Sequence, residues 1–179
     1  MPAPIKVQLH AHDPQLARLA ASEGQRICRA ADAVLIVHHI GSTAIPDIVA
    51  KPVIDLLGVV NSLVEFDLQQ HTVEALGYSW HGEYGLAGRR YCKLDDPMTG
   101  ARKFQLHCYA EGDPSIVRHL AFRDYLHAHP LMATEYAAEK QRCAALRPKD
   151  SHQYSDCKAD WIARVERTAL DWFAARTAR

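Results

Sequence analysis

The sequence has no CxxC pair, no net charge and no apolar run long enough to cross a membrane. Because the formal net charge at pH 7 is zero, no overall field favours nucleic acid or an anionic membrane. The five cysteines are scattered and odd in number, which argues for a reducing cytoplasm and against a zinc knuckle or disulfide framework. The opening residues, MPAPIKVQLHAHDP, contain no apolar segment that could serve as a signal. We therefore expect a cytoplasmic protein that binds neither nucleic acid nor a membrane.

The composition that is present, 48% hydrophobic and 23% charged residues, is typical of a folded globular chain. A length of 179 residues fits a single domain, 1–179, of the α+β class. We expect a mixed sheet with helices over residues 1–112 and a helical part packed on it over 113–179. Period-2 and apolar runs predict strands at 5–10, 34–39, 53–60, 89–94 and 103–109. Helical periodicity predicts helices at 15–31, 62–76, 115–128, 130–146 and 151–176.

The most informative stretch joins two of these strands through a turn of small residues, Gly41, Ser42 and Thr43. Glycine lets a backbone approach an oxyanion, while the two hydroxyls and the successive amides donate hydrogen bonds. Lys51 follows in a proline-bounded segment and adds a positive charge. The pattern favours a phosphate site, although such turns between strands also occur without a ligand.

Asp55 lies inside the second apolar run, where an unpaired carboxylate is costly to bury. It therefore requires a metal, several hydrogen-bond donors, or a structural ion pair with Lys51 or an arginine. His107, in the strand FQLHCY, shares a face with Gln105 and Tyr109 and is either a ligand, an acid–base group or a hydrogen-bonded structural residue. His38 and His39 alternate, so at most one of them faces the same site.

The strands predicted at 89–94 and 103–109 are separated by a turn and make a hairpin, which is flanked by the basic pairs Arg89-Arg90 and Arg102-Lys103. Such charges are usually solvated, yet they are also suited to binding a triphosphate.

Several motifs, taken in order, resemble the GrpB family (UPF0157) of the nucleotidyltransferase superfamily. The matching text is HHIGSTAIPDIVAKPVIDL at 38–56, LH at 106–107, HLAFRDYLHAHP at 119–130, EYAAEK at 135–140 and the Tyr154 to Lys158 spacing. The resemblance implies a DNA polymerase β-like fold, with a small mixed sheet and packed helices. In that superfamily a Gly-Ser turn holds nucleotide phosphate, the next strand supplies an Asp-x-Asp pair for Mg²⁺, and a later strand adds a third carboxylate.

On this chain the resemblance places Gly41 and Ser42 on the phosphate turn and Asp55 on the first metal carboxylate. The second position is Leu57, and the later strand offers Gln105 or His107 in place of an acid. The implied function is transfer of a nucleotidyl group from a nucleoside triphosphate to a small acceptor. Residues assigned to the nucleotide are Gly41, Ser42, Thr43, Lys51 and Arg102, and those assigned to catalysis are Asp55 and His107.

The expected cofactor is a divalent metal, Mg²⁺ or Mn²⁺, on Asp55. A single transition metal on Asp55, His107 and His39 is the other possibility, since mixed carboxylate and imidazole sets suit one. The alternative function is a non-catalytic module that binds a nucleotide or phosphorylated small molecule, or stabilises a partner. GrpB-like domains also occur fused to dephospho-CoA kinase, which links this alternative to coenzyme A metabolism.

Overall fold

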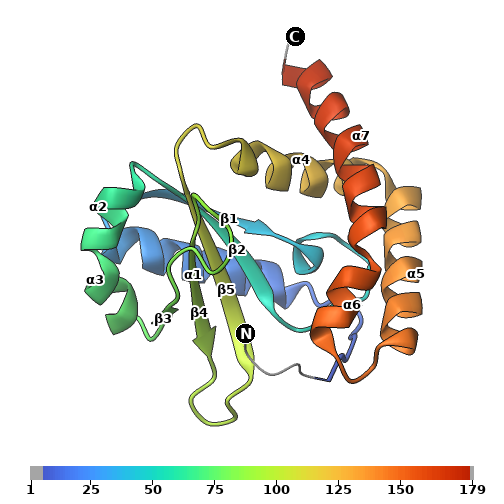
Figure 1. Cartoon of the computed structure of the whole chain (residues 1–179), viewed down its shortest axis with the longest axis horizontal. Coiled ribbons are helices and arrows are strands. Elements are labelled where there is room, and N and C mark those ends of the chain that lie inside the picture. The colour runs from blue at the N-terminus through green and yellow to red at the C-terminus, as the bar shows by residue number, and fades with distance from the viewer. Residues whose placement is uncertain (1–5, 178–179) are drawn as a thin grey trace.

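The computed structural model describes residues 6–177, which form a five-stranded mixed sheet flanked by helices (Figure 1). Across the sheet the strands are β1 (Val34–Ile40), β2 (Ile54–Val60), β5 (Arg102–Ala110), β4 (Arg90–Asp95) and β3 (Ser79–Trp80). The central pair, β2 and β5, is parallel, and every other neighbouring pair is antiparallel. The predicted α+β class with a small mixed sheet is confirmed.

The helices follow the predicted pattern with two interruptions. They are α1 (Gln15–Ala30), α2 (Leu63–Leu68), α3 (Gln70–Ala75), α4 (Pro114–Ala128), α5 (Pro130–Leu146), α6 (Ser151–Cys157) and α7 (Ala159–Thr177). The helix predicted at 62–76 breaks at Gln69, whose side chain accepts a hydrogen bond from the Ala33 amide instead of facing solvent. The helix predicted at 151–176 breaks at Lys158. None of the helices within 6–177 is both long and apolar enough to span a membrane.

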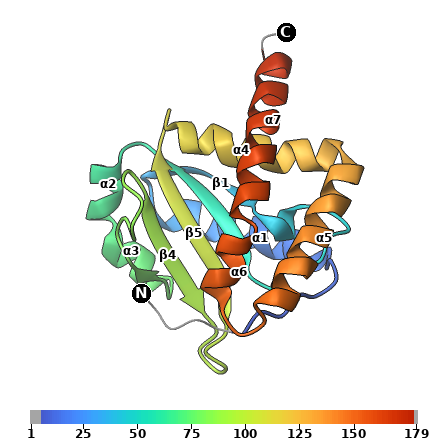
Figure 2. The same ribbon diagram turned by 45° about the vertical axis from the view of Figure 1, so that its right-hand side comes forward.

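Strand β2 is buried on both faces, as its apolar sequence predicts. One face, with Leu56 and Val60, joins the core that α1, α2 and α3 complete. On the other face Leu57 packs with Tyr109 of β5 and with α4. Figures 1 and 2 show α4, α5, α6 and α7 gathered on this second side. The C-terminal helices therefore lie on the sheet face that carries Asp55.

A second core locks the connection between β1 and β2 against the C-terminal helices. Ile45 and Ile48 of this connection are buried among side chains of α4, α5 and α7. The N-terminal segment adds backbone hydrogen bonds between His10 and Ala50. These contacts hold the turn at Gly41 beside α5 and α6.

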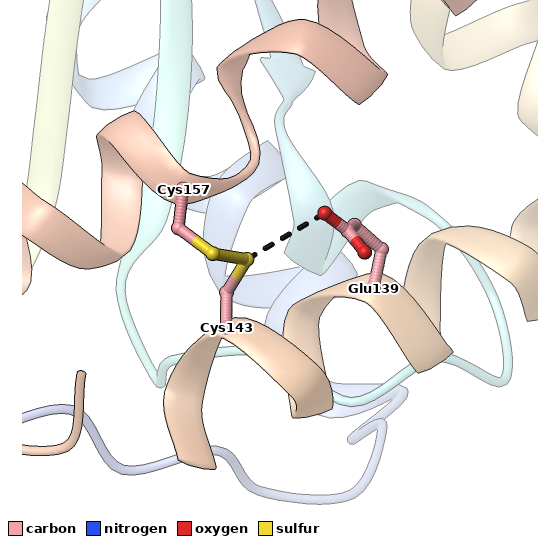
Figure 3. A group of neighbouring side chains, drawn as sticks. All are labelled: Glu139, Cys143 and Cys157. Atoms are coloured by element: carbon pink, nitrogen blue, oxygen red, sulfur yellow. Dashed lines mark hydrogen bonds between the residues drawn. A yellow bond between two sulfur atoms is a disulfide. The ribbon is translucent and has the colours of Figure 1, made fainter. Parts of the chain in front are cut away.

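Two sequence predictions are wrong. A strand is expected at 5–10, but the described residues from 6 onward form a single isolated bridge from His10 to Ala50. The chain there lies beside the loop between β1 and β2 and not beside the edge strand of the sheet. Residue 5 lies outside the described range. The scattered cysteines argue for a reducing cytoplasm and against a disulfide framework, yet Cys143 of α5 and Cys157 of α6 form a disulfide (Figure 3). These two cysteines are 14 positions apart in the sequence, and the packing of α6 against α5 brings them together.

Candidate functional site

The turn after β1 needs glycine at position 41 for two independent reasons. Gly41 has φ 71° and ψ −168°, a backbone conformation that is essentially restricted to glycine. A Cβ atom there would lie 2.5 Å from Oδ2 and 3.0 Å from Cβ of Asp55. The turn and the carboxylate are thus in direct contact, which brings together two of the residues that the sequence predicts for the site.

The Asp55 carboxylate is oriented by a row of polar side chains from β5 and β4. Gln105 Nε2 donates a 2.8 Å hydrogen bond to Asp55 Oδ1. Gln105 Oε1 in turn accepts from the Tyr91 hydroxyl at 2.6 Å, and Tyr91 Oη accepts from Arg102 Nη1 at 3.1 Å. Burial raises the pKa of Tyr91 to about 12, so its hydroxyl remains a donor. Arg102 therefore reaches Asp55 only through two intermediates.

His107 also lies at Asp55, as the strand alternation predicts. Its Nε2 is 3.7 Å from Asp55 Oδ1, which is too long for a hydrogen bond but close enough for an electrostatic contact. Its Nδ1 lies 3.4 Å from Arg89 Nη1. Because arginine only donates, Nδ1 must accept, so the proton of a neutral ring resides on Nε2 and faces Asp55.

A cavity of about 260 Å³ opens beside Asp55, between the sheet and the C-terminal helices. We call it the lysine cavity, and its lining residues are Ser42, Lys51, Val53, Asp55, Gln105, Lys140, Tyr154, Ser155 and Lys158. The three lysines come from three different elements: the segment before β2, the helix α5 and the end of α6. A single carboxylate faces three ammonium groups, so the cavity is positively charged.

The three ammonium groups are held where they are poorly solvated. Burial, followed by repulsion from Lys158 and Lys51, lowers the pKa of Lys140 to about 7. Burial and the charge of Lys51 lower the pKa of Lys158 to about 8. The pKa of Lys51 is lowered mainly by burial as well. An anion in this cavity would relieve the mutual repulsion, so the arrangement favours binding of phosphate or a similar group.

Aromatic rings and a carbonyl position these lysines. The Lys158 and Lys51 ammonium groups lie 4.9 Å and 5.8 Å from the centroid of the Tyr154 ring. Lys140 donates a hydrogen bond to the Val49 carbonyl oxygen, and its side chain is 1% exposed. Such a buried, single-bonded ammonium retains donors for a ligand, because lysine has three.

Ser42 and Thr43 point to different places. The Ser42 hydroxyl lines the lysine cavity and lies 3.4 Å from the Tyr136 hydroxyl. The buried Thr43 hydroxyl instead donates to the Val53 carbonyl oxygen at 3.5 Å and contacts His39 Nε2 at 2.9 Å. Thr43 lines a separate cavity of about 340 Å³ with His10, His12 and Lys51. The structure therefore brings one of the two predicted hydroxyls to the site.

The predicted transition-metal set is not assembled within the described residues. His39 pairs with Leu56 across the strands, and Leu56 faces away from Asp55, so His39 lies on the opposite side of the sheet. Burial lowers the pKa of His39 to about 4. In residues 6–177 the side-chain ligand atoms of His39, Asp55 and His107 do not form a group close enough to share one ion.

Sequence reasoning did not assign roles to Lys140, Tyr154 or Lys158. These residues lie in the EYAAEK stretch and in the Tyr154 to Lys158 spacing, which carry part of the family resemblance. A lysine in the middle of an amphipathic helix is usually solvated, so nothing in its local pattern marks Lys140 as buried. A larger cavity of about 510 Å³ lies between α4 and α7 and contains none of the candidate site residues.

Comparison with known proteins finds relatives of similar sequence and fold. A family model described as GrpB protein matches residues 6–168. The crystal structure of conserved protein GrpB from Enterococcus faecalis matches with a TM-score of 0.85 and 34% identity, and covers 93% of this chain and 99% of that chain.

Two longer proteins match as well. UPF0157 protein YqkA of Bacillus subtilis (strain 168) is 43% identical over 143 residues, which cover 80% of this chain and 41% of YqkA. Dephospho-CoA kinase of Mycobacterium leprae (strain TN) is 28% identical over 182 residues, which cover 88% of this chain and 43% of that protein. The chain thus spans less than half the length of either relative.

Proposed function

The chain belongs to the GrpB family, and from that premise we propose that its lysine cavity binds the phosphate groups of a nucleotide, as a nucleotidyltransferase would. The observation that carries the proposal is the convergence of Lys51, Lys140 and Lys158 on the turn that contains Ser42. Three ammonium groups with lowered pKa values, in a cavity with one carboxylate, match a ligand with several negative charges.

The proposed reaction is transfer of a nucleotidyl group to a small acceptor. The acceptor oxygen forms a bond to the α-phosphorus, and the bond from that phosphorus to the oxygen bridging to the β-phosphorus breaks, so pyrophosphate leaves. Asp55, beside the turn, takes the proton of the acceptor hydroxyl. The lysines stabilise the charge that moves to the leaving pyrophosphate, a role that positive groups fill in phosphoryl transfer.

The residues present do not fit a two-metal set. Asp55 is the single carboxylate that lines the cavity, one of its oxygens is bound by Gln105, and the position of a second acid is the fully buried Leu57. Two Mg²⁺ ions require more oxygen ligands than one aspartate provides. The positive charge in this cavity comes from lysine, and no step of the proposed reaction passes through a metal.

A second candidate function is nucleotide binding without catalysis, either as a ligand-binding or as a partner-stabilising module. The orientation of Asp55 by Gln105 and the presence of Leu57 favour it, because both reduce the chemistry that the carboxylate can perform. The match to dephospho-CoA kinase proteins extends this candidate to adenine-containing ligands such as coenzyme A precursors.

One set of measurements tests both candidate functions, nucleotidyl transfer and nucleotide binding without catalysis. Thermal unfolding is followed with each of the four nucleoside triphosphates, with and without Mg²⁺ or Mn²⁺, and pyrophosphate release is measured in parallel with mixed small hydroxyl acceptors. At 100 times the dissociation constant a ligand adds about 2.7 kcal/mol of stability, which is readily detected. No stabilisation by any triphosphate would refute binding.

The variant Asp55→Asn separates the two candidates. It keeps the shape of the side chain and removes its charge, so nucleotide binding should survive or strengthen. Pyrophosphate release should fall about 100-fold or more if Asp55 is the general base, since such groups contribute on the order of 10²–10⁴. Binding with no turnover in either protein would favour the non-catalytic function.

A further inference from the structure

The Cys143–Cys157 disulfide links two of the elements that line the lysine cavity. It joins α5 near its end to the last residue of α6 (Figure 3). Cys143 follows Lys140 by about one helical turn, and Cys157 immediately precedes Lys158. Each half of the bridge is therefore fixed to an element that carries a cavity lysine.

Helix α6 is short, and the disulfide is its covalent attachment to α5. It is seven residues long, far below the length at which an isolated helix is stable in water. Its buried side chain, Tyr154, packs in a small cluster with Val7 and Cys143. Within the described chain α6 and its end supply three lining residues of the cavity, namely Tyr154, Ser155 and Lys158. A change in the attachment of α6 thus changes the cavity.

The surroundings of the two sulfur atoms differ. Cys157 is partly exposed, whereas Cys143 is fully buried. The Arg142 Nη2 atom lies 3.5 Å from both sulfur atoms, and Glu139 Oε1 lies 3.6 Å from Cys143 Sγ. The guanidinium favours a thiolate, while the carboxylate beside Cys143 would accept a hydrogen bond from its thiol. Cys157 is the more exposed half of the bridge and therefore the half that an external thiol would attack, while the thiol of reduced Cys143 has the Glu139 carboxylate as a hydrogen-bond acceptor.

We propose that Cys143 and Cys157 form a reversible thiol–disulfide site that controls ligand binding in the lysine cavity, an inference that rests on the proposed function. A thiolate of an external dithiol attacks Cys157 Sγ, and the disulfide breaks with Cys143 leaving and taking up a proton. The second thiol of the dithiol then displaces Cys157 as a thiol. The dithiol is oxidised to its own disulfide, and the protein disulfide is reduced to two thiols.

Reduction removes the covalent link between α5 and α6, so Lys158 and Tyr154 are held less firmly in the cavity. Oxidation restores the bridge and with it the arrangement of the three lysines. The cavity is thus assembled in the oxidised protein and loosened in the reduced one.

The test compares ATP binding by isothermal titration calorimetry before and after treatment with dithiothreitol, with the thiol state checked by alkylation and mass spectrometry. Reduction should raise the dissociation constant about 10-fold or more. The variant C143S/C157S should bind as weakly as the reduced protein, with or without dithiothreitol. The matched control Cys28→Ser removes a partly exposed free cysteine and should respond as the natural chain does. Equal affinity of the fully reduced and oxidised proteins would overturn the proposal.

Amide hydrogen exchange gives a second readout that needs no ligand. Reduction should accelerate exchange in residues 151–157 about 10-fold or more and leave β2 unchanged. If ATP binds neither form, the proposed function fails, and exchange alone decides whether the disulfide controls α6. Unchanged exchange in 151–157 after reduction would refute that control. If the two cysteines do not form a disulfide after treatment with oxidised glutathione, control of α6 by the disulfide is also refuted.

Discussion

Replacing Gly41 by alanine tests the contact between the turn and Asp55. The backbone at Gly41 is restricted to glycine, which makes any other residue unfavourable by about 1–3 kcal/mol. The new Cβ would also lie 2.5 Å from Asp55 Oδ2 and 3.0 Å from Asp55 Cβ. The carboxylate would have to move and lose its bond from Gln105, worth about 1.5–3 kcal/mol for a charged acceptor. We expect a total loss of about 3–5 kcal/mol in the free energy of unfolding.

Gly100→Ala is the matched control. Gly100 also has a positive φ of 69°, but a Cβ there meets no atom within 4 Å. The loss in the free energy of unfolding for Gly100→Ala should be limited to the backbone preference for glycine, about 1–2 kcal/mol. Urea unfolding of both variants, each alone and combined with Asp55→Ala, isolates the clash. The loss of stability in Gly41→Ala should exceed the loss in the control by about 2 kcal/mol. Much of that excess should disappear when Asp55 is replaced by alanine. Equal losses in the two single variants would refute the contact.

Three further predictions follow from burial and cross-linking. Burial lowers the pKa of Lys140 to about 7, so from pH 7 upward the unfolded chain holds a proton that the folded chain releases. The free energy of unfolding should therefore rise with pH by up to about 1.4 kcal/mol per pH unit from this group. Urea unfolding at pH 7.0 to 8.5 should show that the free energy of unfolding of Lys140→Met rises less steeply with pH, by that amount. Burial lowers the pKa of His39 to about 4, so as pH falls from 6.5 toward 4 the unfolded chain gains a proton before the folded chain does, and the free energy of unfolding declines. An NMR titration of the His39 imidazole that gave a pKa near 6.5 would contradict this burial. Reduction of the Cys143–Cys157 bridge, whose partners are 14 residues apart, should lower the free energy of unfolding by about 3 kcal/mol in urea, and a change near zero would show that α6 is held without it.

The half of the site on the sheet could be predicted from the sequence because its geometry is local. Two apolar runs joined by a small-residue turn predict adjacent strands, and alternation along β5 places Gln105 and His107 on one face. The parallel register pairs Asp55 with Gln105, which brings these side chains together. Alternation also limits the two histidines of β1 to one candidate, but it cannot say which; register across the sheet places His39 on the opposite face.

The helical half could not be predicted, because it depends on contacts between segments far apart in the sequence. Lys140 and Lys158 reach the cavity only after α5 and α6 have packed against the sheet. The disulfide depends on that same packing. At the turn, residues Ser42–Ala44 form a short 3₁₀ helix, η1, in which successive side chains point about 120° apart. This is why Ser42 faces the cavity and Thr43 does not, although the sequence presents them as equivalent.

The most direct test of phosphate binding in the lysine cavity is the affinity of ATP for the oxidised protein and two lysine variants, measured by isothermal titration calorimetry at low ionic strength. Lys158→Met removes a cavity ammonium and keeps its stem. Lys149→Met removes an exposed lysine from the same region of the chain and serves as the matched control. A charge-assisted bond to phosphate is worth about 1.5–3 kcal/mol, which corresponds to a weakening of about 10- to 100-fold. We expect that loss for Lys158→Met and a change under about twofold for Lys149→Met. Equal affinities in all three proteins would contradict phosphate binding in this cavity.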